Sequence, residues 1–344
     1  MNIEIITTPN EALKESGFGT IKACKSVLDA INRMGFNASI SICKTKNDLD
    51  DIIKRKPGLV ILAVKYIPAI KNDDTCQDDI WLSDHFARHN INFTGSSRQT
   101  LKFDSNKVLA KTHLTNKGIK TAKYFIAIPG QYKIENELPV TFPLFLKPLD
   151  AANGNGIDDS SFVTNFTEYE NKIESLYEIY KQPILVEEYL DGREFTVSVI
   201  NTSDEKLIVS AVEVIPPTST HGLRILGSQA KKDNSEELIE IVDNEVSNRV
   251  ITLAIEAFNA LGVRDFGRID IKTDNHGECF FMEANLVPGM TRGSSYFPKA
   301  CEIAHELAYD KVIELLLSGG LARAVSTVPP NIHPDSNNNF VTAI

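Results

Sequence analysis

The segment RIDIKTDNHGECFFMEANLVPG, residues 268–289, carries the pattern that decides the fold. Side chains two residues apart on a β-strand point to the same face, so Arg268 lies beside Asp270. The same spacing places Glu283 beside Asn285, and the Asp-Asn-His-Gly turn between the two pairs predicts a hairpin. Two carboxylates, an amide and a guanidinium are costly to bury unless they are paired or bind a metal. The face is therefore either an ion-paired surface or a site where oxygen ligands hold magnesium and arginine binds phosphate.

Length and composition indicate a globular protein with more than one unit. The 344 residues exceed one average domain, so we expect two or three subdomains. A hydrophobic content of 42% and a charged content of 24% are typical of soluble globular chains rather than disordered ones. The net charge of -10 argues against a sequence-independent nucleic-acid binder, although a local basic pocket for a nucleotide remains compatible with it.

The cysteines and the N-terminal sequence indicate the compartment. The five cysteines are scattered, odd in number and without CxxC spacing, which favours reduced thiols over disulfides or a zinc site. The first residues do not resemble a signal peptide, and no apolar run reaches the length of a membrane span. We therefore expect a cytoplasmic protein that binds neither membranes nor nucleic acid.

The order of apolar patterns predicts an α/β fold. Residues 1–100 alternate short apolar strands with amphipathic helices, which predicts a parallel sheet covered by helices. A Lys-rich helix is expected over residues 104–117, strands dominate residues 140–245, and a helix is expected over residues 247–261. Residues 318–344 are rich in Gly, Pro and Asn and are predicted to form a mobile tail.

A lysine followed by a loop of small residues is a candidate phosphate site. Lys147 ends an apolar strand, and the loop after Pro148 contains Asn153, Gly154 and Gly156. Such a loop lets backbone amides approach a phosphate while the lysine supplies charge. The alternative is an ordinary turn with an exposed lysine. The loop matches neither the P-loop nor the full GxGxxG pattern, so neither a Walker-type nor a Rossmann cofactor site is supported.

Further charged residues are candidates for binding a nucleotide. Glu187 ends an apolar strand, where its carboxylate can bind an adenine edge. Glu194, further along the chain, is a candidate for binding the ribose hydroxyls. Lys107 and Lys111 lie one helical turn apart. For each of these side chains a solvated position is the alternative interpretation. The sequence has no nucleophile elbow of the form GxSxG, so a hydrolase is disfavoured.

Taken in chain order, these segments resemble the ATP-grasp superfamily, and most closely the D-alanine–D-alanine ligases. The resemblance covers most of residues 90–317. The motifs that carry it are Lys107, Lys147-Pro148 with its loop, Glu187-Glu188-Tyr189-Leu190, Gly192-Arg193-Glu194, Arg268-x-Asp270 and Glu283-x-Asn285-x-x-Pro288-Gly289-Met290-Thr291. Several motifs in family order are more specific than any one of them.

The resemblance implies an α/β protein with an ATP-grasp fold and an N-terminal Rossmann-like, pre-ATP-grasp domain with a parallel sheet. The implied division is an N-terminal domain (1–100), a small lid subdomain (101–186), a C-terminal subdomain with the metal site (187–317) and the tail (318–344).

The implied activity is ATP-dependent ligation of a carboxylate to an amine through an acyl-phosphate, with release of ADP and phosphate. The implied cofactors are ATP and two Mg²⁺ ions, which Mn²⁺ can replace. Arg268 and the Gly289 amide would stabilise the tetrahedral oxyanion. The implied ATP contacts are Lys107, Lys147, Asn153, Gly154, Gly156, Glu187, Glu188, Leu190 and Glu194; the implied metal ligands are Asp270, Glu283 and Asn285; and the implied catalytic residues are Arg268, Gly289, Glu15 and Ser295.

The substrate end departs from the D-alanine ligases. Lys65 stands where that family has a histidine, and Asn153 stands where it has a serine in the phosphate loop. The mobile loop keeps Lys231 but lacks the tyrosine that follows it, and Tyr296 replaces a leucine beside the second substrate. Lys65, Lys231 and Tyr296 are the candidate substrate contacts. Glu15 either binds the first substrate's ammonium or is a surface or capping residue.

Three functions remain open at the level of sequence. The first is synthesis of D-alanyl-D-alanine for peptidoglycan, and the second is ligation of another amino-acid pair, a longer peptide or a metabolite. The third is an ATP-binding module without turnover. The family also implies small-molecule amino-acid substrates and a homodimer.

Overall fold

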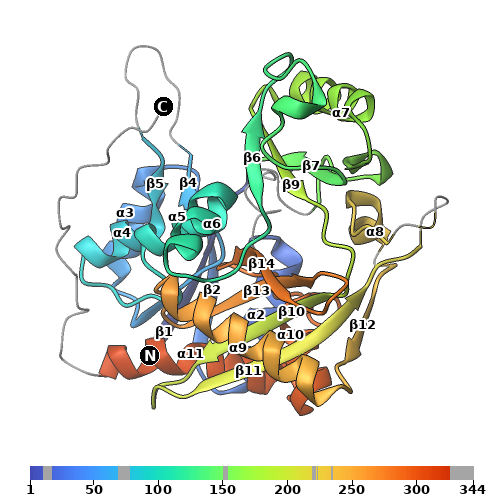
Figure 1. The fold of residues 1–344 in the computed structure, drawn as a ribbon. Helices are drawn as coiled ribbons and strands as arrows, with labels where there is room; N and C mark the ends of the chain where they lie inside the picture. The colour runs from blue at the N-terminus through green and yellow to red at the C-terminus, as the bar shows by residue number, and fades with distance from the viewer. Residues whose placement is uncertain are drawn as a thin grey trace, which may run out of the picture.

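The computed structural model describes residues 1–10, 18–68, 78–149, 154–218, 222, 224–233 and 235–325, without the side chains of Ser228, Lys231, Lys232 and Val325. Within these ranges the chain forms three main sheets and one short two-stranded ribbon. The N-terminal sheet lies on the left of Figure 1, a four-stranded sheet at the upper right, and a five-stranded sheet below it. None of the helices in the described part of the chain combines the length and apolar character that a membrane-spanning segment needs.

The N-terminal unit is a parallel sheet between two layers of helices. Its elements are β1 (Asn2–Thr7), α2 (Ile21–Arg33), β2 (Asn37–Ile42), α3 (Lys46–Arg55), β3 (Leu59–Leu62), β4 (Tyr66–Ile67), β5 (Ile80–Trp81) and α4 (Leu82–Arg88). The strand order is β2-β1-β3, all parallel. Leu59 and Ile61 of β3 share a core with α2, whereas Val60 and Leu62 share another with α3, since alternate side chains face opposite ways. The parallel sheet predicted within residues 1–100 is confirmed.

The middle of the chain forms two helices and an antiparallel sheet. Its elements are α5 (Arg98–Ser105), α6 (Lys107–Asn116), β6 (Tyr124–Ala127), β7 (Leu144–Pro148), β8 (Phe162–Val163), α7 (Phe166–Tyr180) and β9 (Ile184–Glu188), with sheet order β6-β9-β7-β8. Helix α7 interrupts the region in which we expected strands to dominate. Tyr169, Ile173 and Leu176 recur at helical spacing on its buried face, and Asn165 caps its first turn.

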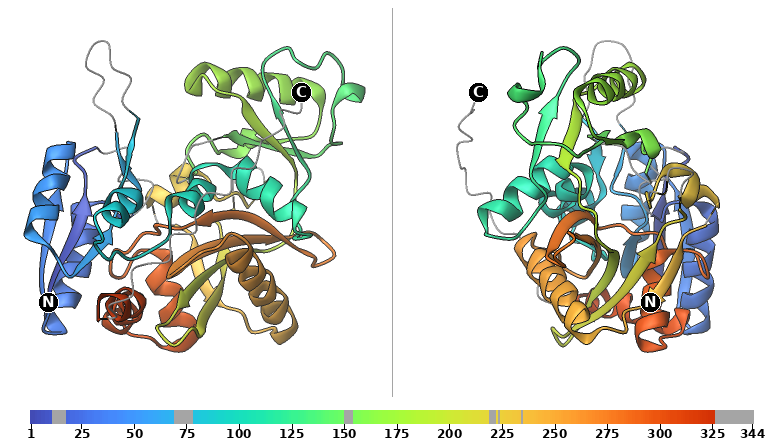
Figure 2. Two further views of the ribbon diagram at one scale, coloured as in Figure 1. Left: turned by 90° about the vertical axis from the view of Figure 1, so that its left-hand side faces the viewer. Right: turned by 45° about the vertical axis from the view of Figure 1, so that its right-hand side comes forward.

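The C-terminal unit is a five-stranded antiparallel sheet with helices on its faces. Its elements are β10 (Glu194–Asn201), β11 (Leu207–Ile215), α8 (Ser228–Asp233), β12 (Glu237–Glu240), α9 (Asn244–Ala260), β13 (Phe266–Thr273), β14 (Cys279–Asn285), α10 (Tyr296–His305) and α11 (Tyr309–Val325), with sheet order β12-β11-β10-β13-β14. The predicted β13–β14 hairpin is confirmed. Its turn is closed by Asp274, whose carboxylate accepts from the backbone amides of His276 and Glu278. Figure 2 shows the four-stranded sheet and α7 standing above this unit, with α6 between them.

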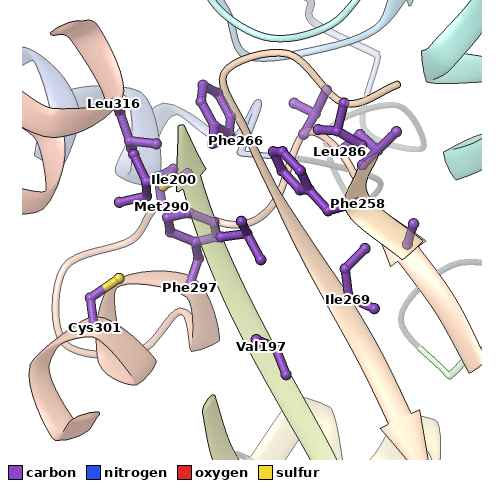
Figure 3. Close-up of a cluster of buried hydrophobic side chains, with 14 of the residues drawn as sticks. Val197, Ile200, Phe258, Phe266, Ile269, Leu286, Met290, Phe297, Cys301 and Leu316 are labelled. Carbon is purple, nitrogen blue, oxygen red and sulfur yellow. The ribbon is translucent and has the colours of Figure 1, made fainter. Parts of the chain in front are cut away.

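A large apolar core fixes the loop that follows β14. Phe258, Phe266 and Phe297 pack together with Leu286 and Met290, as Figure 3 shows. Leu286 and Met290 stand on either side of the loop that carries Gly289, and they are 0% and 1% exposed. The core therefore holds both ends of that loop.

The last helix extends beyond the end that the sequence suggested. Helix α11 runs to Val325, so residues 318–325 do not belong to the predicted tail, and residues 326–344 lie outside the described range. A Cβ on Gly320 would lie 2.9 Å from Leu59 Cδ1, so a glycine permits this close contact with β3. Arg323 binds both carboxylate oxygens of Asp265, at 2.8 and 2.7 Å. Contacts with distant residues stabilise a helical turn that its glycines disfavour.

Candidate active site

A cleft between the four-stranded and five-stranded sheets gathers most of the predicted nucleotide and metal residues. Its empty volume of about 900 Å³ includes space that is open to solvent at the mouth. The predicted residues that line it are Lys107, Lys147, Gly154, Glu187, Glu188, Leu190, Glu194, Asp270 and Glu283. Apolar side chains complete the wall: Phe145, Ile157, Tyr189, Ile225, Leu226 and Met282. A cleft with an apolar wall and a charged floor can hold both a base and phosphates.

A buried ion network lies beneath this cleft. Glu187, 1% exposed, binds Lys111 Nζ through one carboxylate oxygen and Lys147 Nζ through the other, each at 2.6 Å. Burial alone would raise the pKa of Glu187, but the two lysines outweigh it and lower that pKa to about 2. Glu187, predicted to bind adenine, thus orients Lys147 toward the cleft.

The interpretation that Lys111 lies on a solvated face of its helix is wrong. The side chain is 0% exposed, and its ammonium also donates to the backbone carbonyl of Phe281 at 3.4 Å. Burial lowers the pKa of Lys111, because the charged form loses its hydration. Its position one turn after Lys107 was the available signal, but spacing alone does not show which helix face is buried.

Other residues predicted to bind the nucleotide have structural partners as well. Lys107, at the start of α6, lies 3.7 Å from Glu283, and Lys272 lies 3.7 Å from Glu194. Glu188 accepts a hydrogen bond from the backbone amide of Lys123 at 2.7 Å. These pairs leave the carboxylates and ammonium groups at the edge of the cleft, within reach of a ligand.

Gly156 is required by a close approach in the phosphate loop. Its φ of +78° is one that L side chains rarely adopt. A Cβ there would lie 2.5 Å from Pro148 Cγ. The glycine therefore lets the loop fold back onto the strand that carries Lys147.

The predicted metal ligands occupy one end of the hairpin. Asp270 lies opposite Glu283 in the strand register, and Arg268 lies opposite Asn285. Asp270 accepts from Thr196 Oγ1 at 2.7 Å and from Asn285 Nδ2 at 3.0 Å. Within the described ranges, no three His, Cys, Asp or Glu side chains form a metal cluster. The donor set is instead two carboxylates and an amide, and oxygen donors of this kind fit Mg²⁺ or Mn²⁺.

The catalytic candidates adjoin these ligands. Arg268 binds both carboxylate oxygens of Asp270 at 3.0 Å, and its guanidinium stacks 5.3 Å from the ring centre of Tyr296. Tyr296 donates a hydrogen bond to Glu236, a partner that the sequence did not suggest. Burial and this carboxylate raise the pKa of Tyr296, so it remains a neutral phenol. The arrangement joins the metal end of the site to the predicted substrate end.

The Gly289 loop packs closely against the start of α10. A Cβ on Gly289 would lie 2.9 Å from Ser295 Oγ. That hydroxyl accepts from the Thr291 amide at 2.8 Å, which closes the loop. Only a glycine fits position 289 without displacing Ser295.

Lys65 has a protein partner rather than an open position. Its ammonium binds Asp104 Oδ1 at 2.8 Å, and the two side chains are 6% and 7% exposed. Asp104 was not among the predicted site residues, because its isolated carboxylate in a helix gave no motif. The remaining predictions are not placed: Glu15 and Asn153 lie outside the described residues, and of Lys231 only the backbone within α8 is described.

Comparison with known proteins identifies the family. Residues 114–318, more than half of the chain, match a family described as "D-ala D-ala ligase C-terminus". A D-alanine–D-alanine ligase of Carboxydothermus hydrogenoformans is 31% identical over 241 residues, which cover 67% of this chain and 73% of that protein. Uncharacterized protein y4sG of Sinorhizobium fredii is 26% identical over 235 residues, 66% of each chain. A D-alanine–D-alanine ligase of Marinomonas is 30% identical, and the match spans 61% of its length.

Solved structures share the fold over nearly the whole chain. D-alanine–D-alanine ligase of Bacillus anthracis, complexed with ATP, is 20% identical with a TM-score of 0.70, covering 94% of this chain and 98% of that one. VanG D-Ala:D-Ser ligase of Enterococcus faecalis is 21% identical with a TM-score of 0.67, covering 93% and 99%. The predicted ATP-grasp fold is thereby confirmed. The chain belongs to the D-alanine–D-alanine ligase family of ATP-grasp proteins.

Proposed function

We propose that this protein is an ATP-dependent ligase that joins the carboxylate of one amino acid to the amine of another. One observation carries the proposal: Asp270 lies opposite Glu283 and is bound by Arg268. Groups suited to metal-bound phosphates therefore adjoin a group suited to an oxyanion. Transfer of a phosphate to a carboxylate, followed by attack of an amine, needs this order of charges.

In the first step, an oxygen of the substrate carboxylate attacks the γ-phosphorus of ATP, and the bond to ADP breaks. Lys107 and Lys147 face the cleft and supply positive charge for the phosphates. Glu187 fixes the direction of Lys147 through the ion pair at 2.6 Å. The product of this step is an acyl-phosphate.

Asp270, Glu283 and Asn285 would hold the divalent cations, for which we propose two Mg²⁺ ions with Mn²⁺ as a substitute. When bound, the cations would offset the negative charge of the phosphates. Asn285 has its Nδ2 on Asp270, so its carbonyl oxygen is the atom left to act as a ligand.

In the second step, the amine nitrogen attacks the acyl carbon, phosphate leaves, and the nitrogen loses a proton. The Arg268 guanidinium and the Gly289 amide would donate to the oxyanion. Arg268 uses Nε and Nη2 for Asp270, so its Nη1 is the group available to the substrate.

The amino acids remain the open part of the proposal. Two molecules of D-alanine, joined for peptidoglycan, are the first candidate, because several similar curated proteins are named D-alanine–D-alanine ligases. A different pair is the second candidate. Lys65 and Tyr296 depart from the family at the substrate end, and VanG, with the same fold, is named a D-Ala:D-Ser ligase.

The protein's state in the cell belongs to the same proposal. We expect a homodimer that acts on small molecules and binds no nucleic acid. Consumption of ATP and the absence of paired cysteine spacing favour the cytoplasm.

The test is release of ADP and phosphate with Mg-ATP, first with D-alanine alone and then with pairs of D- and L-amino acids. Turnover with D-alanine alone supports the first candidate, and turnover only with another pair supports the second. ATP binding measured by titration calorimetry without ADP release under any pair would refute the ligase proposal and leave a silent ATP-binding module.

A further inference from the structure

The carboxylate of Asp104 joins three separate parts of the chain. Asp104 lies in the last turn of α5. Its Oδ1 accepts from Lys65, which follows β3 of the N-terminal unit, at 2.8 Å. Its Oδ2 accepts from the backbone amides of Leu286 and Val287, at 2.6 and 3.3 Å. Both carboxylate oxygens are thus used, one for an ammonium and one for the segment that follows β14.

The two amides are the first ones beyond the strand ladder. Pairing of β14 with β13 ends at Asn285, so the amide of Leu286 needs an acceptor outside the sheet. Leu286 is 0% exposed and Val287 is 4% exposed, so bulk solvent does not supply an acceptor for their amides. An unpaired amide at this depth is destabilising, because it loses its hydrogen bond to water and gains none in return. Asp104 therefore fixes the direction in which the backbone leaves the sheet.

That direction decides where the Gly289 amide points. Only Pro288 separates Val287 from Gly289, and proline restricts both its own φ and the residue before it. Met290, anchored in the core of Figure 3, fixes the far end of the loop. With both ends held, the Gly289 amide has little freedom.

Lys65 makes the buried carboxylate tolerable. A carboxylate at 7% exposure is costly to bury without a partner, and the Lys65 ammonium at 2.8 Å offsets that cost. The same ion pair directs the ammonium of Lys65 to a partner within the protein. The prediction that Lys65 binds a substrate carboxylate did not include this pairing.

We propose that Asp104, held by Lys65, is a positioning residue for the oxyanion-binding amide of Gly289, an inference that rests on the proposed ligase function. Helix α5 leads directly into α6, which begins with Lys107. One carboxylate thereby couples the loop of the second step to the helix that presents a lysine to the phosphates. Loss of this acceptor slows attack of the amine and leaves ATP binding intact.

The test compares two double variants in the full-length protein. Lys65→Met with Asp104→Asn removes the ion pair but keeps an amide oxygen as acceptor. Lys65→Met with Asp104→Leu removes the ion pair and the acceptor. We expect kcat to fall about 100-fold in the leucine variant and within about fivefold in the asparagine variant, with the KM for ATP changed less than about threefold in both.

A second measurement does not depend on turnover. Hydrogen exchange of the peptide that contains Leu286, Val287 and Gly289 should rise in the leucine variant and stay near the wild-type level in the asparagine variant. Thermal unfolding of both variants shows whether they are folded. The control is Arg55→Met with Glu4→Gln, which removes another salt bridge in the N-terminal unit and should change neither readout.

The outcomes separate this inference from the ligase proposal. Equal kcat values in the two double variants, or equal exchange of the loop, overturn the positioning role. Faster exchange in the leucine variant supports the loop's dependence on Asp104 even if the protein never releases ADP. In that case the absence of ADP release refutes the ligase function alone. If the leucine variant does not fold, Lys65→Met with Asp104→Ser replaces it, because the serine hydroxyl is too short to reach the two amides. A lower kcat together with faster exchange of the loop in this variant supports the inference. Wild-type values of kcat and of exchange overturn it.

Discussion

The nucleotide end and the amino-acid end of the site use charge in different ways. At the proposed nucleotide end, Lys147 pairs with Glu187, and Lys107 lies 3.7 Å from Glu283, yet all of these side chains line the cleft. At the proposed amino-acid end, Arg268 binds Asp270 and Lys65 binds Asp104, and neither Arg268 nor Lys65 is among the residues that line the cleft. These charges therefore have protein partners at both ends, and the ends differ in whether the paired cations line the cleft.

Loss of hydration explains why the charges at both ends are paired. A charged group in water is hydrated and needs no partner within the protein. Enclosed charges lose that hydration and need a partner within the protein. Each pairing at the amino-acid end therefore changes what a side chain offers a substrate, and residue identity alone does not predict it.

The largest expected effect comes from breaking one charge in each region. Arg268→Ala removes the oxyanion donor and should lower kcat about 1000-fold with little change in the KM for ATP. Glu283→Gln removes a metal ligand, should abolish turnover to a similar extent, and should also raise the Mg²⁺ concentration that the residual rate requires. Initial rates of ADP release over a Mg²⁺ series measure both.

Arg193→Ala is the matched control for these variants, because Arg193, directly before β10, pairs with Glu213 of β11 and does not line the cleft. It should keep near-normal rates. Near-normal rates in Arg268→Ala or Glu283→Gln would instead contradict the assignment of the hairpin face.

The next effect concerns the tight loop at the amino-acid end. Gly289→Ala places a Cβ about 2.9 Å from Ser295 Oγ, so kcat should fall about 100-fold as the loop shifts. Adding Ser295→Ala removes the close contact and should recover part of that rate. An unchanged kcat in Gly289→Ala, or a lower kcat in the double variant than in Gly289→Ala, would show that packing of Gly289 against Ser295 does not position the Gly289 amide.

A stability comparison tests the buried network at the nucleotide end. Glu187→Gln leaves two buried lysines facing each other and should destabilise the fold by about 3–5 kcal/mol. Lys111→Met leaves the Glu187–Lys147 pair intact and should cost less. Urea unfolding of both variants measures the order, and a reversed order would mean that Lys111 contributes more than the carboxylate it binds.

The smallest effect is a pH dependence of stability. Burial would raise the pKa of Glu187, yet the two lysines lower it to about 2 in the folded protein, below the ordinary value of 4.5. A lowered carboxyl pKa stabilises the fold above pH 4.5, and this stabilisation is lost as the pH falls toward 2. The difference in unfolding free energy between wild type and Glu187→Gln should therefore shrink over that range. Glu170→Gln, at an exposed position of α7, is the control, and a constant difference would contradict the ion pairs.

Local pattern was enough to predict the hairpin, and family order was enough to select most of the charged residues that line the cleft. Residue spacing placed Arg268 beside Asp270 and Glu283 beside Asn285, because alternation along a strand is a local property, and the predicted hairpin brought the two pairs together. The same local patterns did not reveal that Lys111 is buried. Its partner Glu187 lies on β9, far along the chain, and only the packing of α6 against the sheets brings them together.

The sequence by itself determined the α/β order and the turn of the hairpin, since these depend on periodicity and turn chemistry, and its resemblance to the family supplied the side chains predicted to bind ATP and magnesium. Only the tertiary structure decided the pairing of Lys65 with Asp104, that of Tyr296 with Glu236, and the continuation of α11 through Gly319 and Gly320. Each of these depends on residues that meet from distant segments. A buried charge takes whichever partner the fold brings within reach, and that choice is not encoded in its neighbours along the chain.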